Sequence, residues 1–444
     1  MNAVGPNVSR RRLLRTVLAL GLTGPFLSAC TGFNTSGSGA DALTFLSTQF
    51  TPVEETERFR AILRTASNRA VNYVTTSDPS QFHAAIRAQV SSGQVRTSLL
   101  GGVHGDLSPL ANGLLEDVSD LASELSDRNY SADFRQLAMA GTDRTWYIPW
   151  AQATYLVAIH KPALEYLPAG ADPARLTYQQ FLDWAVAARR ATGSPQFGLP
   201  AGNKGLLYRF LQGYLYPSFT GGQVTSFRGP EAVEMWRYLK DLWANCTPAS
   251  ANFSAMQEPL LAGQVQVAWD HVARLVQAPA QRPQDWMMVP APSGPKGRGY
   301  MPILTGLAIP KGAPDVAGAK ALIRVLSNAQ VQNEVLRQNS FFPTVAGQLP
   351  ADLSPATRME ADAVAAQRDA PDALVALPPV GLGQKDGEMN KVFRDAFTSI
   401  VLQGNDIRTT LDQQGRVMQS LLDAASAPCW APDPAAGGHV CQVA

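Results

Sequence analysis

The sequence has little charge, and neither sign is concentrated anywhere. Charged residues make up 16% of its 444 positions, and the formal net charge is +1 at pH 7. A protein that neutralises a run of phosphates needs clustered lysine and arginine, so this balance argues against nucleic-acid binding. The 36 glycines and 32 prolines follow no period. Collagen-like chains, coiled coils and solenoid repeats are therefore excluded.

Cysteine is scarce, and the spacings typical of zinc fingers and ribbons are missing. The four cysteines are Cys30, Cys246, Cys429 and Cys441. Cys429 and Cys441 enclose a short loop of Trp, Pro and Gly, and outside the cell a disulfide there would hold an end that otherwise lacks a core. Cys246 is left over, and we expect it to be a buried thiol.

Residues 1–29 are typical of an export signal rather than of a folded domain. Arg10, Arg11, Arg12 and Arg15 precede an apolar stretch that glycine and proline interrupt, and this stretch is too short for a comfortable membrane span. The segment 9–15 resembles a twin-arginine export signal. An arginine-rich signal for the Sec pathway is the alternative.

Leu27-Ser28-Ala29-Cys30 resembles the bacterial lipobox. The thiol of Cys30 would carry diacylglycerol through a thioether, and two or more acyl chains give the stable anchoring that one chain does not. A free cysteine near a plain cleavage site is the alternative. Residues 30–41 are rich in glycine and serine and are predicted to be a lipidated, flexible tether. We therefore expect an exported protein that is lipid-anchored at the membrane surface, on the periplasmic side or the cell exterior.

Strand and helix patterns alternate in the first part of the mature chain, which predicts an α/β fold with parallel strands. In such sheets ligands lie beyond the carboxyl ends of the strands. Polar or glycine-rich residues follow two of these ends, at 47–50 and 101–106, although each could be a simple turn. Thr177 and Gln180 have the spacing of a helix capping box. The predicted elements are strands at 43–47, 71–74, 96–100 and 155–160 and helices at 53–66 and 80–91.

Five later segments follow one another in an order that resembles a known protein family. They are 141–164 (a glycine, an aromatic-rich strand, a proline and a second strand), 177–191, 258–269 (helix, glycine, strand), 300–311 (ending in Ile-Pro-Lys-Gly) and 317–345. In this order the chain resembles the extracellular solute-binding proteins of ABC importers, in the carbohydrate-binding family that includes maltose-binding protein. The resemblance covers nearly all of the mature chain, and no single segment is diagnostic.

The resemblance implies a two-lobed periplasmic-binding-protein-like fold (type II), with a hinge of crossing strands and a ligand cleft between the lobes. The crossings would fall near 150–153, 302–305 and 326–329. It also implies a monomer without cofactor, metal or enzymatic activity, whose partners are a carbohydrate ligand and the transmembrane subunits of an ABC permease. The predicted lobes are 42–151 with 304–327 and 152–303 with 328–444.

A sugar-binding site needs flat aromatic rings for C–H faces and polar or charged side chains for hydroxyl groups. Such residues lie at the predicted strand ends and crossings. The candidate ligand-binding residues are Gln49, Phe50, His104, Asp106, Trp150, Gln152, Lys204, Tyr208, Trp269, Asp270, Arg274, Tyr300, Thr305 and Phe342.

Several candidates have a structural alternative. Trp150 could equally be a core aromatic, and Asp270 could cap a helix that begins at His271. Arg274 could only pair with Asp270, and Lys204 could be solvated. Three other tryptophans have helical spacing and are interpreted as core residues: Trp184, Trp236 and Trp243.

Other function classes find weaker support. A zinc site could use His104 and His271 with Asp106 or Asp270, but the remaining histidines complete no triad. The segment 294–299 lacks the Gly-Lys-Ser/Thr ending of a phosphate loop and is predicted to be a basic hairpin turn. An exported carbohydrate-active hydrolase would need two carboxylates about 5 to 10 Å apart, for which Asp106 and Asp270 are the best pair. A binding protein for a polyamine or a glycerophosphodiester is the third alternative.

Overall fold

The structure is a computed structural model and describes residues 42–444. The predicted export signal, Cys30 and the tether lie outside these residues. Within 42–444, no helix is both long and apolar enough to cross a membrane. The two sheets described below belong to one structural unit, Ala40–Ala444.

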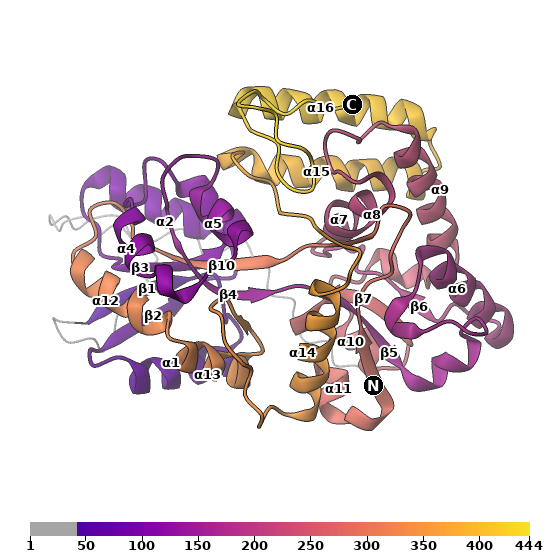
Figure 1. Cartoon of the computed structure of the whole chain (residues 1–444), viewed down its shortest axis with the longest axis horizontal. Coiled ribbons are helices and arrows are strands. Elements are labelled where there is room, and N and C mark those ends of the chain that lie inside the picture. The colour runs from indigo at the N-terminus through magenta and orange to yellow at the C-terminus, as the bar shows by residue number, and fades with distance from the viewer. Residues whose placement is uncertain (1–41) are drawn as a thin grey trace, which may run out of the picture. The chain divides into compact units, whose positions relative to one another are not determined.

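The first sheet has six strands (Figure 1). β1 pairs in parallel with β2 and β3, as the alternating pattern predicted, whereas β10 is antiparallel to both β3 and β4. β3 begins later than predicted and continues through Gly101, where a Cβ atom would lie 2.8 Å from the ring of Phe45. In order across the sheet, the strands are β11 (Phe342–Pro343), β4 (Ile148–Ala153), β10 (Ile303–Ala308), β3 (Leu99–Val103), β1 (Leu43–Ser47) and β2 (Val71–Thr75).

Helices pack on both faces of the first sheet, and together they form the first lobe. One core contains Phe59, Leu322 and Val335 with Phe45 of the sheet. Phe82 and the helix around Leu137 pack on the other face. The helices of this lobe are α1 (Val53–Ala66), α2 (Pro79–Ser92), α3 (His104–Leu107), α4 (Ser119–Glu124), α5 (Ala132–Met139), α12 (Val316–Leu326) and α13 (Ala329–Asn339).

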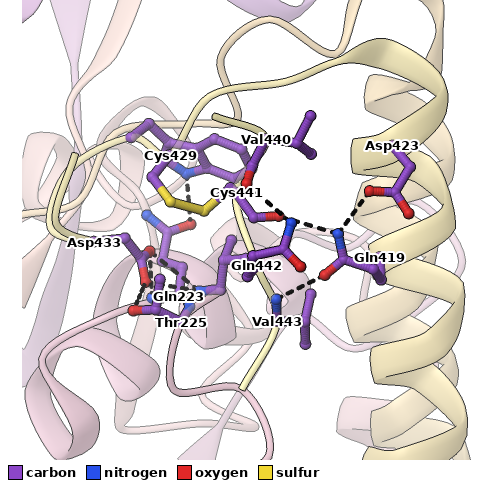
Figure 2. Close-up of a disulfide and its surroundings, with 12 residues drawn as sticks. Gln223, Thr225, Gln419, Asp423, Cys429, Asp433, Val440, Cys441, Gln442 and Val443 are labelled. Carbon is purple, nitrogen blue, oxygen red and sulfur yellow. Dashed lines mark hydrogen bonds between the residues drawn. A yellow bond between two sulfur atoms is a disulfide. The ribbon is translucent and has the colours of Figure 1, made fainter. Parts of the chain in front are cut away.

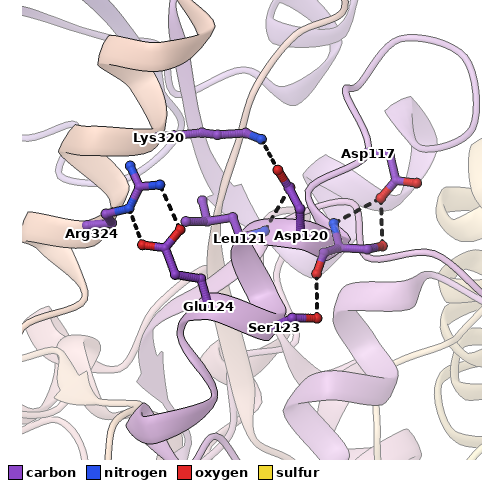
Figure 3. A network of polar contacts seen from close by, with 8 residues as sticks. Asp117, Asp120, Leu121, Ser123, Glu124, Lys320 and Arg324 are labelled. Atoms are coloured by element: carbon purple, nitrogen blue, oxygen red, sulfur yellow. Dashed lines mark hydrogen bonds and ion pairs between the residues drawn. The ribbon is translucent and has the colours of Figure 1, made fainter.

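Two ion pairs join α4 to α12, whose paired residues lie 200 positions apart in the sequence (Figure 3). Lys320 Nζ contacts Asp120 Oδ2 at 2.5 Å. Arg324 donates to both carboxylate oxygens of Glu124, at 2.5 and 2.7 Å. Because exposed ion pairs contribute little free energy, these pairs help to position α12 more than they stabilise it.

The second sheet has four strands and organises the second lobe. β5 is antiparallel to β7 and β8, and β7 is parallel to β6. A separate two-stranded ribbon joins β9 to β12. The strands are β6 (Phe197–Gly198), β7 (Val267–His271), β5 (Tyr155–His160), β8 (Trp286–Val289), β9 (Arg298–Tyr300) and β12 (Ala373–Val375).

The helices of the second lobe include the predicted capping box. Gln180 N donates to Thr177 Oγ1 at 3.2 Å, and Thr177 N donates to Gln180 Oε1 at 3.0 Å. Trp184 and Trp236 are fully buried, as expected, whereas Trp243 is half-buried and packs on Phe397. The helices are α6 (Tyr178–Thr192), α7 (Leu207–Phe210), α8 (Tyr216–Thr220), α9 (Pro230–Ala244), α10 (Gln257–Leu261), α11 (Gln277–Gln281), α14 (Pro355–Arg368), α15 (Asp386–Phe397) and α16 (Ile407–Ala425).

Three chain segments cross between the lobes. The first is Thr154, between β4 and β5, and the second runs through Met301 and Pro302, between β9 and β10. Both lie near their predicted positions. The third follows β11 and leads to α14, so the sequence placed it too early, at 326–329. The reason is that α13 and β11 still pack in the first lobe, since β11 pairs with β4 and Val335 of α13 lies in the first lobe's core.

The residues after α16 are tied to the second lobe (Figure 2). A disulfide joins Cys429 to Cys441, the pair that the sequence suggested. The carboxylate of Asp433 accepts backbone N–H groups of residues 223–225. Gln419 of α16 receives the N–H of Val443 at 2.8 Å. Cys246 is a buried free thiol.

Candidate functional site

A cavity of about 640 Å³ lies between the two lobes, beyond the carboxyl end of β3. We call it the interlobe pocket. Strand ends of this kind are where α/β sheets bind ligands. Its first wall comes from α2 and α3 and its second wall from α7 and α15. The polar and charged side chains that line it are Ser80, His83, Arg87, Asp106, Tyr208, Arg209, Gln384, Asp386 and Asn390.

Asp106 is the central residue of the first wall. It follows β3 directly, in α3, and is only 7% exposed. The hydroxyl of Thr48 donates to Asp106 Oδ2 at 2.6 Å, and His83 Nε2 donates to the carbonyl oxygen of Asp106 at 2.7 Å. Burial raises the pKa of the Asp106 carboxyl. The strand end that the sequence pointed to therefore supplies a desolvated carboxylate.

Asp386 is the central residue of the second wall, at the first position of α15. A chain of hydrogen bonds leads to it. Arg209 Nη1 donates to Gln212 Oε1 at 3.0 Å, Gln212 Nε2 to Asn390 Oδ1 at 3.1 Å, and Asn390 Nδ2 to Asp386 Oδ2 at 3.0 Å. Burial raises the pKa of Asp386, and the nearby charge of Arg209 opposes that shift.

The two walls come close at Gly105. A Cβ atom on Gly105 would lie 3.3 Å from Asp386 Oδ2, so this carboxylate rests near the backbone of α3. Burial is the largest cause of the raised pKa of Asp106, and the nearby charge of Asp386 raises this pKa further. The pocket therefore brings together two desolvated carboxylates, one from each lobe.

The arginines that line the pocket, Arg87 and Arg209, and the nearby Arg394 contact protein groups. The guanidinium of Arg394 lies 4.3 Å from the ring centroid of Tyr208, and that of Arg209 lies 4.9 Å from it. Arg87 Nη1 lies 2.8 Å from the side-chain amide of Gln384, when this amide turns its oxygen toward the guanidinium. Each of these guanidinium groups therefore has at least one protein contact.

A second cavity, of about 470 Å³, touches all three crossing segments. We call it the hinge pocket. It is lined by three residues that the sequence proposed as ligand contacts, Gln152, Tyr300 and Phe342. Gln152 Nε2 donates to the carbonyl oxygen of Pro343 at 2.6 Å, so its amide is partly used by the protein. Its walls combine apolar side chains, such as Phe134 and Val364, with polar and charged ones, such as Asp133 and Arg368.

Several predicted contacts are core residues instead. Trp150 is 0% exposed and packs on Phe59, with ring centroids 5.2 Å apart, and on Phe50. Trp269 stacks on Tyr155 at 4.8 Å inside the second lobe. Thr305 is fully buried in β10. The platform role expected for Trp150 and Trp269 is therefore corrected, because neither ring has a face open to a cavity.

His104 is also buried, and both ring nitrogens are used by the protein. Nδ1 lies 2.8 Å from the hydroxyl of Tyr147 and Nε2 lies 3.0 Å from the carbonyl oxygen of Pro379. Burial lowers the pKa of His104 to about 4. The expected ligand contact at His104 is thus a neutral structural residue.

Asp270 and Arg274 brace a loop of the second lobe. Asp270 accepts the N–H groups of Met256 and His271 at 2.9 and 2.7 Å, and burial raises its pKa to about 6. Arg274 Nη1 donates to the carbonyl oxygen of Ser254 at 2.8 Å. The carboxylate of Asp270 therefore orders the segment before α10 rather than facing a ligand.

The remaining candidates lie apart from both pockets. Gln49 is half-buried, and its carbonyl oxygen accepts the hydroxyl of Tyr73 at 2.7 Å. Lys204 is exposed. Within residues 42–444, no three histidine, cysteine, aspartate or glutamate side chains gather where they could hold a metal ion.

The interlobe pocket contains residues that the sequence did not reveal. Two pairs follow helical i, i+4 spacing beside an apolar stripe, His83 with Arg87 on α2 and Asp386 with Asn390 on α15. That spacing places each pair on one helix face. It does not indicate that the two helices face one cavity, because only the tertiary packing of the whole chain places α15 near the end of β3.

Comparisons with known proteins agree with this architecture. The sequence pattern of the family described as bacterial extracellular solute-binding protein matches residues 54–333. A comparison with curated protein sequences gave no match.

Solved structures with this fold include three with a bound small molecule. The GacH receptor of Streptomyces glaucescens, solved unliganded and with acarbose, is 16% identical over 86% of this chain and 98% of that one, with a TM-score of 0.68. Maltose-bound MalE3 of T. maritima is 17% identical over 86% and 100%, with a TM-score of 0.69. UgpB of Mycobacterium tuberculosis with glycerophosphocholine is 18% identical over 87% and 99%, with a TM-score of 0.69. At these identities the likeness concerns the two-lobed fold.

Proposed function

We propose that this chain, which belongs to the bacterial extracellular solute-binding protein family, captures a sugar or oligosaccharide in its interlobe pocket and delivers it to the membrane permease of an ABC importer. It acts as a monomer and performs no catalysis. The observation that carries this proposal is the pocket itself, whose two walls bring Asp106 and Asp386 together from separate lobes.

The polar groups of the pocket suit hydroxyl groups. A hydroxyl group donates to a carboxylate and accepts from a guanidinium or an amide, and hydrogen bonds to charged partners are the stronger ones. A solute that contacts both walls binds the closed arrangement better than an open one. Only this difference in affinity shifts the population toward the closed form that a permease would recognise.

Membrane attachment rests on the sequence. Cys30 within its lipobox-like segment would carry the lipid, and residues 31–41 would tether the unit Ala40–Ala444 to the membrane surface. The basic segment before it supports export through the twin-arginine pathway, with Sec export as the alternative.

Two alternatives have a specific basis. A glycerophosphodiester ligand is suggested by UgpB with its glycerophosphocholine, and a polyamine is suggested by the two pocket carboxylates. A hydrolase is less favoured. Its best predicted carboxylate pair, Asp106 with Asp270, does not share the pocket, because Asp270 is fully buried and bonded to backbone N–H groups.

A thermal-shift screen tests the proposal. The protein is produced without residues 1–29 and with Cys30→Ser, and is screened against mono-, di- and oligosaccharides, polyamines and glycerophosphodiesters. A ligand at roughly a hundred times its Kd stabilises the folded state by about 2.7 kcal/mol and raises the melting temperature. A shift with a saccharide supports the proposal. A shift only with a polyamine or phosphodiester overturns the sugar assignment, and cleaved saccharide overturns the assignment as a pure binding protein.

A further inference from the structure

Two carboxylates of the interlobe pocket keep most of their capacity to accept hydrogen bonds. A carboxylate offers about four acceptor sites. Asp106 takes one side-chain hydrogen bond, from Thr48, and Asp386 takes one, from Asn390. Among the residues that the structure describes, neither carboxylate has a cation within 4.0 Å.

Several neighbouring side chains also contact protein groups. Asn390 donates one amide N–H to Asp386, and Arg209 donates through Nη1 to Gln212. His83 Nε2 donates to the carbonyl oxygen of Asp106. Arg87 contacts the side-chain amide of Gln384. The unused acceptor capacity of the two carboxylates therefore suits a ligand group that is rich in donors.

We propose that the captured solute carries a primary ammonium group beside its hydroxyl groups, as an amino sugar does, and that Asp106 and Asp386 hold this group from opposite lobes. This inference rests on the proposed function and names the substrate class of the same pocket. Hydrogen bonds between an ammonium group and a carboxylate are charge-assisted, and they strengthen where water is excluded. Asp106 and Asp386 are 7% and 9% exposed, which meets that condition.

The aromatic side of the pocket favours a primary over a quaternary ammonium group. A quaternary ammonium group has no N–H donor and is usually held against free aromatic faces. The aromatic ring that lines this pocket, Tyr208, has guanidinium groups of Arg394 and Arg209 within 4.3 and 4.9 Å of its centroid. An N–H donor can use the carboxylates, whereas a methylated nitrogen finds the ring already engaged.

The same geometry would couple closure to the ligand's charge. Like charges that share a desolvated site repel each other, and here one charge belongs to each lobe. An ammonium group between Asp106 and Asp386 replaces that repulsion by two attractions, which exist only when both walls are close. The differential affinity for the closed form would therefore come from the nitrogen.

Matched saccharides test the inference. Mono- and disaccharide triplets that carry an amine, an acetamide or a hydroxyl group at one position are titrated calorimetrically into the protein, with spermidine and glycerophosphocholine as further arms. The amine member should bind at least about tenfold more tightly than its two counterparts. Tighter binding of the hydroxyl or acetamide member overturns the inference and leaves sugar binding intact. Tightest binding of spermidine or glycerophosphocholine also overturns it, and binding of nothing overturns the proposed function as well.

Charge-removing variants locate the effect. Asp106→Asn and Asp386→Asn keep the side-chain shape, and each should reduce the preference for the amine by about tenfold. Glu388→Gln is the matched control, since Glu388 is exposed on α15 and pairs with Lys385. Melting curves verify that each variant is folded. An unchanged amine preference in both folded aspartate variants would overturn the inference.

Discussion

Asp433 in the C-terminal segment and Asp386 in the interlobe pocket are both buried, yet they differ in how many donors surround them. Asp433 accepts the N–H groups of Gln223, Val224 and Thr225, at 2.7 to 3.1 Å, and the hydroxyl of Thr225 at 2.6 Å (Figure 2). Asp386 accepts one side-chain donor, from Asn390. A saturated carboxylate anchors the chain, whereas one with acceptor capacity left beside a cavity is available to a ligand.

Glu360 on α14 is a third buried carboxyl group, and it has fewer hydrogen-bond donors than either Asp433 or Asp386. It is 0% exposed, and among residues 42–444 neither of its carboxylate oxygens has a hydrogen-bond partner. Burial raises its pKa to about 8. A carboxyl group in this environment is neutral below that pH and is costly to ionise above it.

Replacing Glu360 should give the largest effect. Its pKa lies above the ordinary 4.5 in the folded state, so its contribution to stability is complete below about pH 4.5 and is lost as the pH rises through about 8. The loss amounts to up to roughly 5 kcal/mol. Glu360→Gln should remove this dependence. Urea unfolding of both proteins at pH 5 and pH 9 measures it, and an equal decline in both would contradict the assignment.

Removing the saturated carboxylate ranks second. Asp433→Ala leaves its donors without an acceptor and should lower the free energy of unfolding by roughly 4 kcal/mol, since each buried unsatisfied donor costs about 1 to 3 kcal/mol. Ligand affinity should stay unchanged in the folded fraction. If Asp433→Ala instead weakened binding and spared stability, the distinction between anchoring and binding carboxylates would fail.

Opening the disulfide ranks third. The bridge between Cys429 and Cys441 closes a sequence separation of 12 residues, and a loop of that size contributes about 3 kcal/mol by restricting the unfolded chain. The double variant Cys429→Ser, Cys441→Ser should therefore unfold at lower urea concentration. Reducing agent should shift the wild type in the same direction and leave the double variant unaffected. Identical urea midpoints for the two proteins would show that the bridge is not an anchor.

The smallest effect is expected at the contact between the walls. Gly105→Ala places a methyl group 3.3 Å from Asp386 Oδ2, which should move the carboxylate slightly and weaken binding by up to about tenfold, or about 1.4 kcal/mol. Gly347→Ala is the matched control in the hinge pocket, because nothing lies within 4 Å of its added Cβ. Equal affinities in the two variants would indicate that the interlobe contact is not sensitive to Asp386.

Local signals predicted much of the fold. Apolar spacing gave α1 its observed bounds, Val53–Ala66, and β5 its bounds, Tyr155–His160. The capping box at Thr177 could also be predicted from the sequence, because the motif involves only residues that are close together in the chain. The third crossing was misplaced, since a helix pattern does not say which sheet the helix packs against.

The candidate site was predicted only in part. Strand ends led to Asp106, which lines the interlobe pocket, because residues that follow a parallel strand lie at the edge of the sheet where α/β proteins bind ligands. Trp150 was expected at the cleft and is in the core. The sequence of a buried strand does not show which of its aromatic rings faces a cavity. Asp386 was missed because its meeting with α3 depends on the packing of the whole second lobe.

Hydrogen exchange with the tightest ligand from the saccharide titrations tests the central claim most directly. The account predicts slowed amide exchange on binding in α2, α3, α7 and the start of α15, the four elements that wall the interlobe pocket. Slowed exchange confined to residues 129–134, 342–349 and 361–368, which border the hinge pocket, would contradict it and move the binding site to the hinge.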